Sequence, residues 1–442
     1  MELPISLRLN RVAMRSTRFW DENICASQLH YKANLLHLVA FTAACLLVFS
    51  RRPDAILNAQ FFAEDGQRWY ADAYQFGLRS LLIPDEAGGY LHTVPRLAAL
   101  LSLLFPLARA PLVMNLCAIA IQVLPVTIFI SSRFPCIPLW KRLLGSFLYL
   151  GTPNSYGTNA NATNIQWHLG LLACLVLLAQ PPNSQRWKVF DSIVLILISV
   201  ESPMGIVLLA VAVVSWWVKR NRWSRISLAL LVPGAVVQTL VVFTSHARGL
   251  GPNGATISRL ISILGRQVFL ASLVGETKVL HFALRYSERT SFLLEALATA
   301  VGVAVLGYAL RYAPWELKLF IGFSFTIFAL SLARPIAGAV VQSQWEWLRF
   351  PGTSNRYYYL PIISFLAAVL WLVNYAPCRL ARFSGIALLL FVCIAVRRDW
   401  RYPAFEDMHF QEYALKFQAA PIGTRMVIPI NPPGVKMVLV KR

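Results

Sequence analysis

Long runs of apolar residues limit what this chain can fold into more than any other feature. Hydrophobic residues make up 57% of the sequence and charged residues only 14%, whereas soluble domains carry about 25% charged residues. Eleven runs approach or reach the length that a helix needs to cross a bilayer. They are 34–50, 111–131, 138–152, 166–180, 189–201, 203–218, 226–244, 291–309, 317–334, 356–374 and 383–397. The sequence therefore predicts an all-α polytopic membrane protein, and it excludes a water-soluble enzyme, a disordered chain and a disulfide-stapled secreted module.

The basic residues predict which ends of these runs face the cytoplasm. The net charge is +21, which would suggest nucleic acid in a soluble chain, but much of this charge lies in short links between apolar runs. With a cytoplasmic N-terminus, every inner link is basic, as the positive-inside rule expects. These links are 132–137, 181–188, 219–225, 310–316 and 375–382. Anionic membrane lipids and lipid phosphates are then the expected partners, and no nucleic acid is expected.

One further run, 94–108, is apolar but short, with a proline near each end. As a twelfth span it would move several basic links outside, against the charge bias. We therefore predict eleven transmembrane helices, with 94–108 on the outer surface. The predicted parts are a cytoplasmic basic N-terminus 1–33, a transmembrane module 34–244 with a large outer loop 51–110, a second transmembrane part 245–397 with outer loops 245–290 and 335–355, and an extracytoplasmic tail 398–442. Long loops on one face indicate that function lies there.

Motifs of soluble enzymes, nucleotide sites and metal sites are absent. The sequence lacks Gly-x-Gly-x-x-Gly, a Walker loop, His-Glu-x-x-His and Gly-x-Ser-x-Gly. None of the seven cysteines has a metal-ligand spacing. We therefore expect no cofactor, and no set of ligands supports a divalent metal. Ionisable residues are nearly missing from the middles of the predicted spans, where ion-coupled transporters and channels usually place them.

The first outer loop has the strongest functional pattern, Phe-Phe-Ala-Glu-Asp-Gly-Gln-Arg-Trp-Tyr. If it is helical, one face carries Asp65, Arg68, Trp69 and Asp72. One interpretation is a solvated helix in which Arg68 pairs with Glu64 and Asp72. The other is a catalytic site in which the carboxylates carry the chemistry and Arg68 and Trp69 bind substrate.

This loop, followed by a surface helix that opens at Gly-Tyr-Leu-His-Thr-Val-Pro-Arg over 89–96, resembles the GT-C superfamily of integral membrane glycosyltransferases. The likeness covers 1–245 as topology and these two segments as motif. It implies a polyprenyl-phosphate-linked sugar donor, a glycan or glycolipid acceptor, a catalytic acid in the first outer loop and a place in the prokaryotic plasma membrane. The commonest pattern has Asp first in the acidic pair and a Pro-Pro stretch before the surface helix. This sequence has neither, so Glu64 and Asp65 both remain candidates.

One carboxylate is enough for an inverting sugar transfer. It accepts the proton of the acceptor hydroxyl while the anomeric carbon is attacked. A lipid phosphate then leaves without a general acid, provided that cations or hydrogen-bond donors hold its charge. We expect Asp65 to be the base, with Glu64 bound to Arg68 or orienting the acceptor.

Cations at the outer ends of the predicted spans are candidates to bind the donor phosphate. His92 and Arg96 open the surface helix, and the last outer loop ends in Arg349 and then Arg356-Tyr357. The Arg356-Tyr357 pair resembles the arginine that meets the carrier phosphate in GT-C enzymes. Arg and Tyr at an interface are also ordinary membrane anchors.

Two more outer segments supply candidates for substrate binding. The second outer turn contains Asn164, Gln166, Trp167 and His168. Amides and an indole suit sugar hydroxyls and a sugar ring face, although a helix cap followed by an interfacial Trp has the same pattern. Arg266 lies in an apolar, basic stretch of the next outer loop, which predicts a helix in the headgroup region, as a lid over the carrier lipid or as an anchor.

The tail predicts a small outer hairpin, because β-type runs at 426–430 and 436–440 flank Asn-Pro-Pro-Gly. Two alternatives to a glycosyltransferase stay open. A lipid-linked glycan transporter or flippase would need a charged, hydrated cavity through the spans. A non-catalytic partner in envelope polysaccharide assembly would tolerate loss of the acidic pair.

Overall fold

The computed structural model describes residues 30–245, 252–336 and 343–442, so most of the predicted N-terminal segment lies outside the described residues. The described chain is mostly helical and has one two-stranded sheet. The elements are α2 (His30–Arg51), α3 (Asp54–Leu57), η1 (Asp65–Tyr70), α4 (Ala71–Phe76), η2 (Gly77–Leu82), α5 (Thr93–Ser102), η3 (Leu107–Arg109), α6 (Ala110–Ile130), α7 (Leu139–Leu150), η4 (Tyr156–Thr158), α8 (Ile165–Leu178), α9 (Gln185–Glu201), α10 (Met204–Lys219), α11 (Arg222–Thr244), α12 (Ile257–Ile263), η5 (Leu264–Leu270), α13 (Ala271–Val274), α14 (Glu276–Arg285), α15 (Glu288–Tyr312), α16 (Trp315–Ala333), α17 (Gln344–Leu348), α18 (Arg356–Tyr375), α19 (Arg379–Arg398), α20 (Phe410–Ala419), β1 (Arg425–Ile430) and β2 (Val435–Val440).

Each of the eleven predicted apolar runs coincides with a helix. Within the described ranges, seven helices are long and apolar enough to cross a membrane: Leu107–Ile130, Arg222–Thr244, Ile257–Val274, Glu288–Tyr312, Trp315–Ala333, Arg356–Tyr375 and Arg379–Arg398. Shorter apolar helices are Leu35–Arg51, Ile165–Leu178 and Met204–Lys219. The run at 94–108 folds as α5, whose 10 residues are too few to span a bilayer. The count of eleven spans stays a prediction.

One of the seven helices lies in the 245–290 segment, where we expected a helix on the membrane surface. Ile257–Val274 is continuous through α12, η5 and α13, and its middle, η5, is π-helical. Gly265 allows this helix to lie close to α15, because a Cβ at that position would be 2.2 Å from the backbone oxygen of Glu295. Its length and composition suffice for a membrane span, which the sequence analysis did not anticipate.

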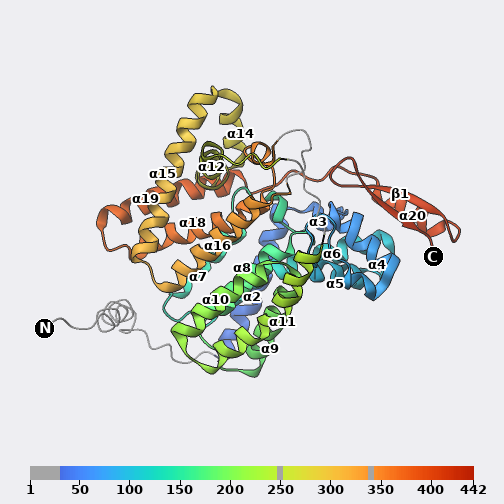
Figure 1. The fold of residues 1–442 in the computed structure, drawn as a ribbon, viewed down its shortest axis with the longest axis horizontal. Coiled ribbons are helices and arrows are strands. Elements are labelled where there is room, and N and C mark those ends of the chain that lie inside the picture. Colours follow the sequence, from blue (N-terminus) through green and yellow to red (C-terminus); the bar gives the residue numbers. More distant parts are fainter. Residues whose placement is uncertain (1–29, 246–251, 337–342) are drawn as a thin grey trace.

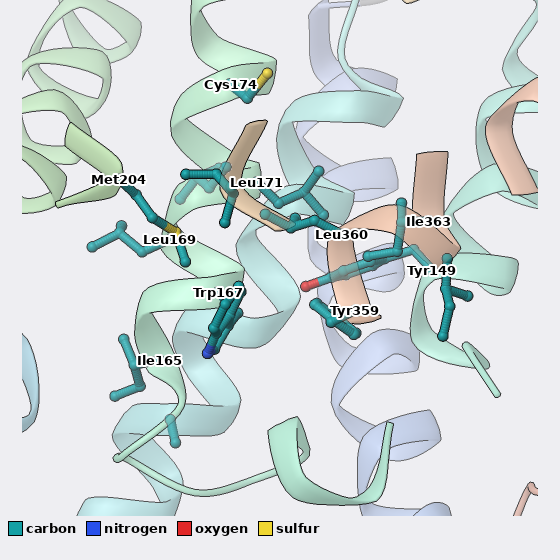
Figure 2. Packing of buried hydrophobic residues seen from close by; sticks show 14 of the residues in the cluster. Tyr149, Ile165, Trp167, Leu169, Leu171, Cys174, Met204, Tyr359, Leu360 and Ile363 are labelled. Atoms are coloured by element: carbon teal, nitrogen blue, oxygen red, sulfur yellow. The ribbon is translucent and has the colours of Figure 1, made fainter. Parts of the chain in front are cut away.

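The two helices α8 and α18 form the centre of the bundle. Nearly all of α8 and most of α18 are buried. The neighbours of α8 are α6, α9 and α10, and those of α18 are α15, α16 and α19, which gives the two groups of helices in Figure 1. Figure 2 shows Leu171 of α8 and Leu360 of α18 in one apolar core. This core supports the two outer segments that precede α8 and α18.

The C-terminal tail returns to the first outer loop. Strands β1 and β2 pair antiparallel, with Arg425 opposite Val440, and Figure 1 shows this hairpin with α20 next to α4. The carbonyl of Asn431 accepts a hydrogen bond from the Ala63 amide at 2.6 Å, and its amide donates to the Phe61 carbonyl at 3.2 Å. The predicted hairpin is thus confirmed, and its turn holds the residues just before the acidic pair.

Candidate functional site

The two acidic residues of the first loop lie in different environments. Asp65 is only 1% exposed. Its Oδ1 accepts a hydrogen bond from the Thr163 hydroxyl at 2.7 Å, and its Oδ2 accepts one from the Ala162 amide at 3.2 Å. Glu64 is partly exposed, and its side chain forms no hydrogen bond or ion pair with any residue that the structure describes. Of these two acids, Glu64 is therefore the one whose carboxylate oxygens are available to a ligand.

Burial raises the pKa of the Asp65 carboxyl to about 7. The hydrogen bonds from Thr163 and Ala162 oppose this shift, and the nearby charge of Glu64 adds to it. A carboxyl group in such surroundings gains or loses a proton near neutral pH, a property that is frequent at functional sites.

Aromatic and cationic side chains adjoin this pair. Trp69 donates from Nε1 to the Thr163 hydroxyl at 3.3 Å. The centroid of its ring is 4.8 Å from that of His92 and 4.8 Å from the guanidinium carbon of Arg96. Arg96 in turn donates from Nη1 to Asp72 at 2.7 Å. The first loop and the start of α5 thus share one cluster.

Residues from α8 and α18 complete this cluster. The ring of Tyr90 is 4.5 Å from that of His92, and the Tyr90 hydroxyl accepts a hydrogen bond from Gln166 Nε2 at 3.4 Å. Trp167 packs edge-on against Tyr357, with ring centroids 6.1 Å apart. These contacts bring together segments that are up to about 270 residues apart in the sequence, as expected for a site supported on a rigid core.

Arg356 is a cation that interacts electrostatically with the Glu64 carboxylate. Its guanidinium lies within Coulombic range of Glu64 and of the Tyr90 hydroxyl, but it forms no ion pair with a described residue. It donates from Nη2 to the carbonyl of Ile336 at 2.8 Å. We call Glu64, Asp65, Trp69, Tyr90, His92, Arg96, Gln166 and Arg356 the acidic cluster.

Several buried polar atoms of this region lack a hydrogen bond among the described residues: Arg96 Nε, His92 Nδ1, Trp167 Nε1 and Glu201 Oε1. His92 Nδ1 lies 3.4 Å from Glu201 Oε1. Buried polar atoms are nearly always paired in native proteins, so these atoms are suited to bind a polar ligand. Glu201 was not among the predicted site residues, although an acid at the end of an apolar run could have indicated it.

Arg68 does not pair with Glu64, contrary to one of our expectations. It forms an ion pair with Asp85, and Asp72 pairs with Arg96 instead. The physical reason is local, because η1 is π-helical and residues four apart no longer stack as they do in an α-helix. Arg68 therefore stabilises the loop through its ion pair with Asp85 and does not pair with Glu64.

Two candidates of the second outer turn are engaged with the protein itself. His168 Nε2 lies 2.7 Å from the Thr158 carbonyl oxygen, and its Nδ1 is 2.9 and 3.1 Å from the hydroxyl oxygens of Tyr149 and Tyr359. Figure 2 shows the side chains of these two tyrosines close together. The side-chain amide of Asn164 donates to the backbone of its own turn at 2.7 Å. Both residues therefore stabilise the second outer turn, which also binds Asp65.

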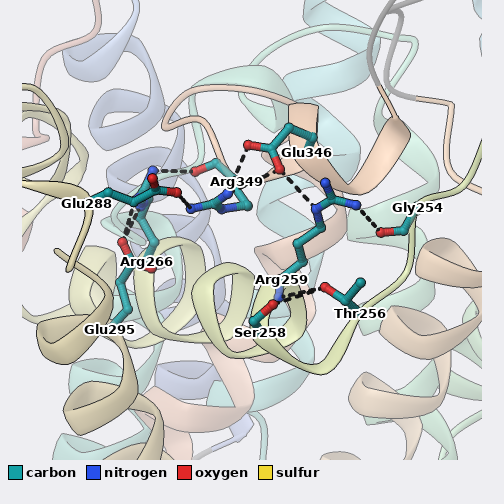
Figure 3. Close-up of polar contacts among 9 residues, drawn as sticks. All are labelled: Gly254, Thr256, Ser258, Arg259, Arg266, Glu288, Glu295, Glu346 and Arg349. Atoms are coloured by element: carbon teal, nitrogen blue, oxygen red, sulfur yellow. Dashed lines mark hydrogen bonds and ion pairs between the residues drawn. The ribbon is translucent and has the colours of Figure 1, made fainter.

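Arg266 and Arg349 lie in a separate set of ion pairs (Figure 3). Arg266 Nε donates to Glu295 at 2.8 Å, and its Nη1 donates to the Arg349 carbonyl at 3.2 Å. Glu346 accepts hydrogen bonds from Arg349 and from Arg259, both at 2.9 Å. We call these five residues the paired cluster. Each of its arginines already has a carboxylate partner, so the cluster joins helices and offers no free cation.

A buried arginine that the sequence analysis missed adjoins the second outer turn. The guanidinium of Arg52 lies 4.3 Å from the ring centroid of Tyr156 and 4.2 Å from that of Phe405. It donates to the Asn159 carbonyl at 3.2 Å and has no carboxylate partner in the described part of the chain. The signal was Arg51-Arg52 itself, because a basic pair at an outer end departs from the positive-inside rule.

No group of three or more His, Cys, Asp or Glu side chains is placed to hold a metal ion within the described ranges. No protein family model matches the chain, and no curated protein matches it. A functional assignment therefore depends on the geometry of the acidic cluster.

Proposed function

We propose that this protein is a membrane glycosyltransferase that moves a sugar, with inversion, from a polyprenyl-phosphate donor to a glycan or glycolipid acceptor at the outer membrane face. The main support is the carboxylate of Glu64, which has no hydrogen bond or ion pair among the described residues and lies within Coulombic range of Arg356. A proton acceptor beside a cation is what a transfer with a phosphate leaving group requires.

Glu64 suits the role of base better than Asp65, which reverses the order that we expected. Both oxygens of Asp65 are occupied by Thr163 and Ala162, and the residue is buried. Glu64 is partly exposed, and its side chain has no hydrogen bond with any residue in the described ranges. In our proposal Asp65 positions the loop on the second outer turn, and Glu64 contacts the acceptor.

The proposed step is a single displacement. The acceptor hydroxyl oxygen attacks the anomeric carbon, and its proton passes to Glu64. The bond from the anomeric carbon to the phosphate oxygen breaks, and its electron pair leaves with the lipid phosphate, whose negative charge Arg356 stabilises. His92 and Gln166 are placed to bind sugar hydroxyls, and Trp167 offers an aromatic face and an unpaired N–H.

The way in which the basic links pack supports a site at the outer face, with the cytoplasmic face at the opposite ends of the helices. Arg133 donates to the Gln180 carbonyl at 2.8 Å, and Lys219 donates to the Ala179 carbonyl at 2.7 Å, so three predicted inner links meet at one end of α8. Trp167 lies at its other end. We propose eleven spans in a prokaryotic plasma membrane, with a cytoplasmic N-terminus. A reporter after Arg186 should then be cytoplasmic and a reporter after Tyr402 external.

The transporter alternative receives less support. The large cavity among the central helices is lined mainly by apolar side chains, which provide no polar path for a glycan. Experiment distinguishes a non-catalytic assembly partner from a glycosyltransferase, because the assembly partner would keep its function without the acidic pair.

The test is sugar transfer by the purified protein in liposomes, with radiolabelled polyprenyl-phosphate hexoses as donors and envelope glycolipids as acceptors. Wild type should label an acceptor, and the double variant Glu64→Gln/Asp65→Asn should not. The matched control is Glu406→Gln/Asp407→Asn, an adjacent acidic pair that is exposed in the tail and should leave transfer unchanged. Transfer by the first double variant would overturn the proposal.

A further inference from the structure

A large cavity lies among helices α6, α7, α8, α16 and α18. Its volume is about 450 Å³, within the usual range of small-molecule sites of about 300–1,000 Å³. Its walls are mostly apolar, with Phe129, Leu144, Leu171, Leu366 and Ala367 among them. Such walls suit a hydrocarbon group and give few hydrogen bonds to a sugar.

The cavity is about as deep as one membrane leaflet. Its wall on α18 extends from Ile363 to Tyr375, which is about 18 Å of helix at a rise of about 1.5 Å per residue. Half of a hydrocarbon core of about 30 Å is about 15 Å. Ile363, Leu171 and Tyr149 line the cavity and lie in the apolar core that Figure 2 shows. The space therefore matches the length of a single acyl chain.

Three charged side chains line the cavity: Arg133, Lys141 and Glu316. Arg133 is paired with Asp191 through two hydrogen bonds of 2.7 and 2.8 Å, and Glu316 attracts Lys219. Lys141 has no carboxylate partner among the described residues. Of these lining residues, Arg133 interacts with Asp191 and Glu316 with Lys219, and both of those partners lie outside the cavity wall, so Lys141 remains available to an anion.

Aromatic rings hold Lys141 at the Tyr375 end of the cavity, which we call its mouth. Its Nζ lies 4.1 Å from the ring centroid of Tyr375 and 5.2 Å from that of Trp140, and Tyr375 and Lys141 both line the cavity. Contacts with ring faces stabilise the ammonium group without neutralising it. The cation is thus pre-positioned where an apolar channel meets the membrane surface.

The length of α18 separates this mouth from the acidic cluster. The helix begins at Arg356, in the acidic cluster, and ends at Tyr375, at the mouth, after 20 residues, or about 30 Å. A lipid whose phosphate lies at Arg356 therefore cannot place the same phosphate at Lys141. The occupant must be a second lipid, from the opposite leaflet.

We propose that this cavity binds one acyl chain of an anionic glycerophospholipid, with the headgroup phosphate at Lys141. The site is independent of the proposed sugar transfer. Anionic headgroups are attracted to basic residues at the membrane surface, and the walls of the cavity replace the neighbouring lipid chains.

Native mass spectrometry of the detergent-purified full chain tests this proposal with three probes: dioleoylphosphatidylglycerol, dioleoylphosphatidylcholine and a polyprenyl phosphate. One phosphatidylglycerol should bind the wild type at least about tenfold more tightly than phosphatidylcholine. Lys141→Glu should remove this preference. Lys188→Glu is the control, because Lys188 is exposed in a neighbouring inner link and does not line the cavity.

A second pair of variants tests the chain pocket. Ala367→Trp places an indole in the cavity and should abolish phosphatidylglycerol binding. Ala387→Trp, at an exposed position on α19, should not change it. Circular dichroism spectra like that of wild type would show that each variant is folded.

Three results would overturn the proposal. They are equal binding of phosphatidylglycerol by wild type and Lys141→Glu, equal binding of phosphatidylglycerol and phosphatidylcholine, and preferential binding of the polyprenyl phosphate. The last result would assign the cavity to a carrier lipid. The sugar-transfer assay does not depend on any of these outcomes, so the two proposals can fail separately.

Discussion

The paired cluster and the acidic cluster both gather charge near helix ends, but they balance it differently. In the paired cluster, Arg266 and Glu295 are buried together and Arg349 binds Glu346. In the acidic cluster, Glu64 has no ion pair and Arg356 contacts only the Ile336 carbonyl and the ring of Tyr357, as far as the described residues show. Satisfied charges hold helices together, whereas a free pair of opposite charges costs stability unless a ligand completes it.

The sharpest test of this difference is the ranking of the two acids. Glu64→Gln should lower sugar transfer by about 10²–10⁴-fold, the usual effect of losing a general base. Its melting temperature should stay near that of wild type, because Glu64 has no structural partner. Asp65→Asn should have the milder effect on transfer. The opposite ranking would return the role of base to Asp65.

Breaking the paired cluster should affect folding instead. Glu295→Ala leaves Arg266 buried without its carboxylate, which should lower the free energy of unfolding by about 3–5 kcal/mol. Denaturation in detergent measures this loss. Transfer per folded molecule should be unchanged, and a selective loss of transfer would place Arg266 in the acidic cluster after all.

Arg356→Lys keeps the charge of the acidic cluster but removes the planar fork of the guanidinium. Loss of one charged hydrogen bond of about 1.5–3 kcal/mol should lower transfer by about 10- to 150-fold. The control is Arg379→Lys, at the start of α19, near the other ends of the helices. Normal turnover in the Arg356 variant would show that this residue is a membrane anchor.

The buried acid should give stability a characteristic pH dependence. The pKa of Asp65 is raised to about 7 in the folded protein from about 3.9 in an unfolded chain. The folded state therefore binds more protons between these values, and stability should fall as pH rises through them, by at most about 1.4 kcal/mol per pH unit. Melting temperatures from pH 4 to 8 should fall more steeply for wild type than for Asp65→Asn. Parallel curves would contradict this prediction.

The smallest effect is expected at the exposed edge of the paired cluster. Arg259 and Glu346 are 30% and 29% exposed, so Arg259→Ala should cost less than about 1 kcal/mol in the free energy of unfolding. A loss as large as that of Glu295→Ala would mean that the paired cluster acts as one unit, which a double-mutant cycle would measure.

Local features of the fold could be predicted because their causes are local. Continuous apolar runs predicted the eleven helices that coincide with them, since a helix in an apolar environment satisfies its own backbone groups. The Asn-Pro-Pro-Gly turn between β-type runs predicted the hairpin at Asn431. The surface helix at α5 followed from its proline and its short length. The 257–274 segment was predicted as a surface helix rather than as a candidate span. A run of this length with scattered basic residues fits both.

The sequence by itself determined that the eleven apolar runs are helical and which residue types collect in the predicted outer segments, because apolar length and turn chemistry act over a few residues. Only the tertiary structure decided which charges are free. Arg68 meets Asp85 and Arg266 meets Glu295, and Asp65 meets Thr163 across 98 positions. In the sequence, nothing distinguished the outer cations and acids that form pairs from those that do not. Among the described residues, Glu64 and Arg356 form no ion pair, since partners distant in sequence are selected by how the helices pack.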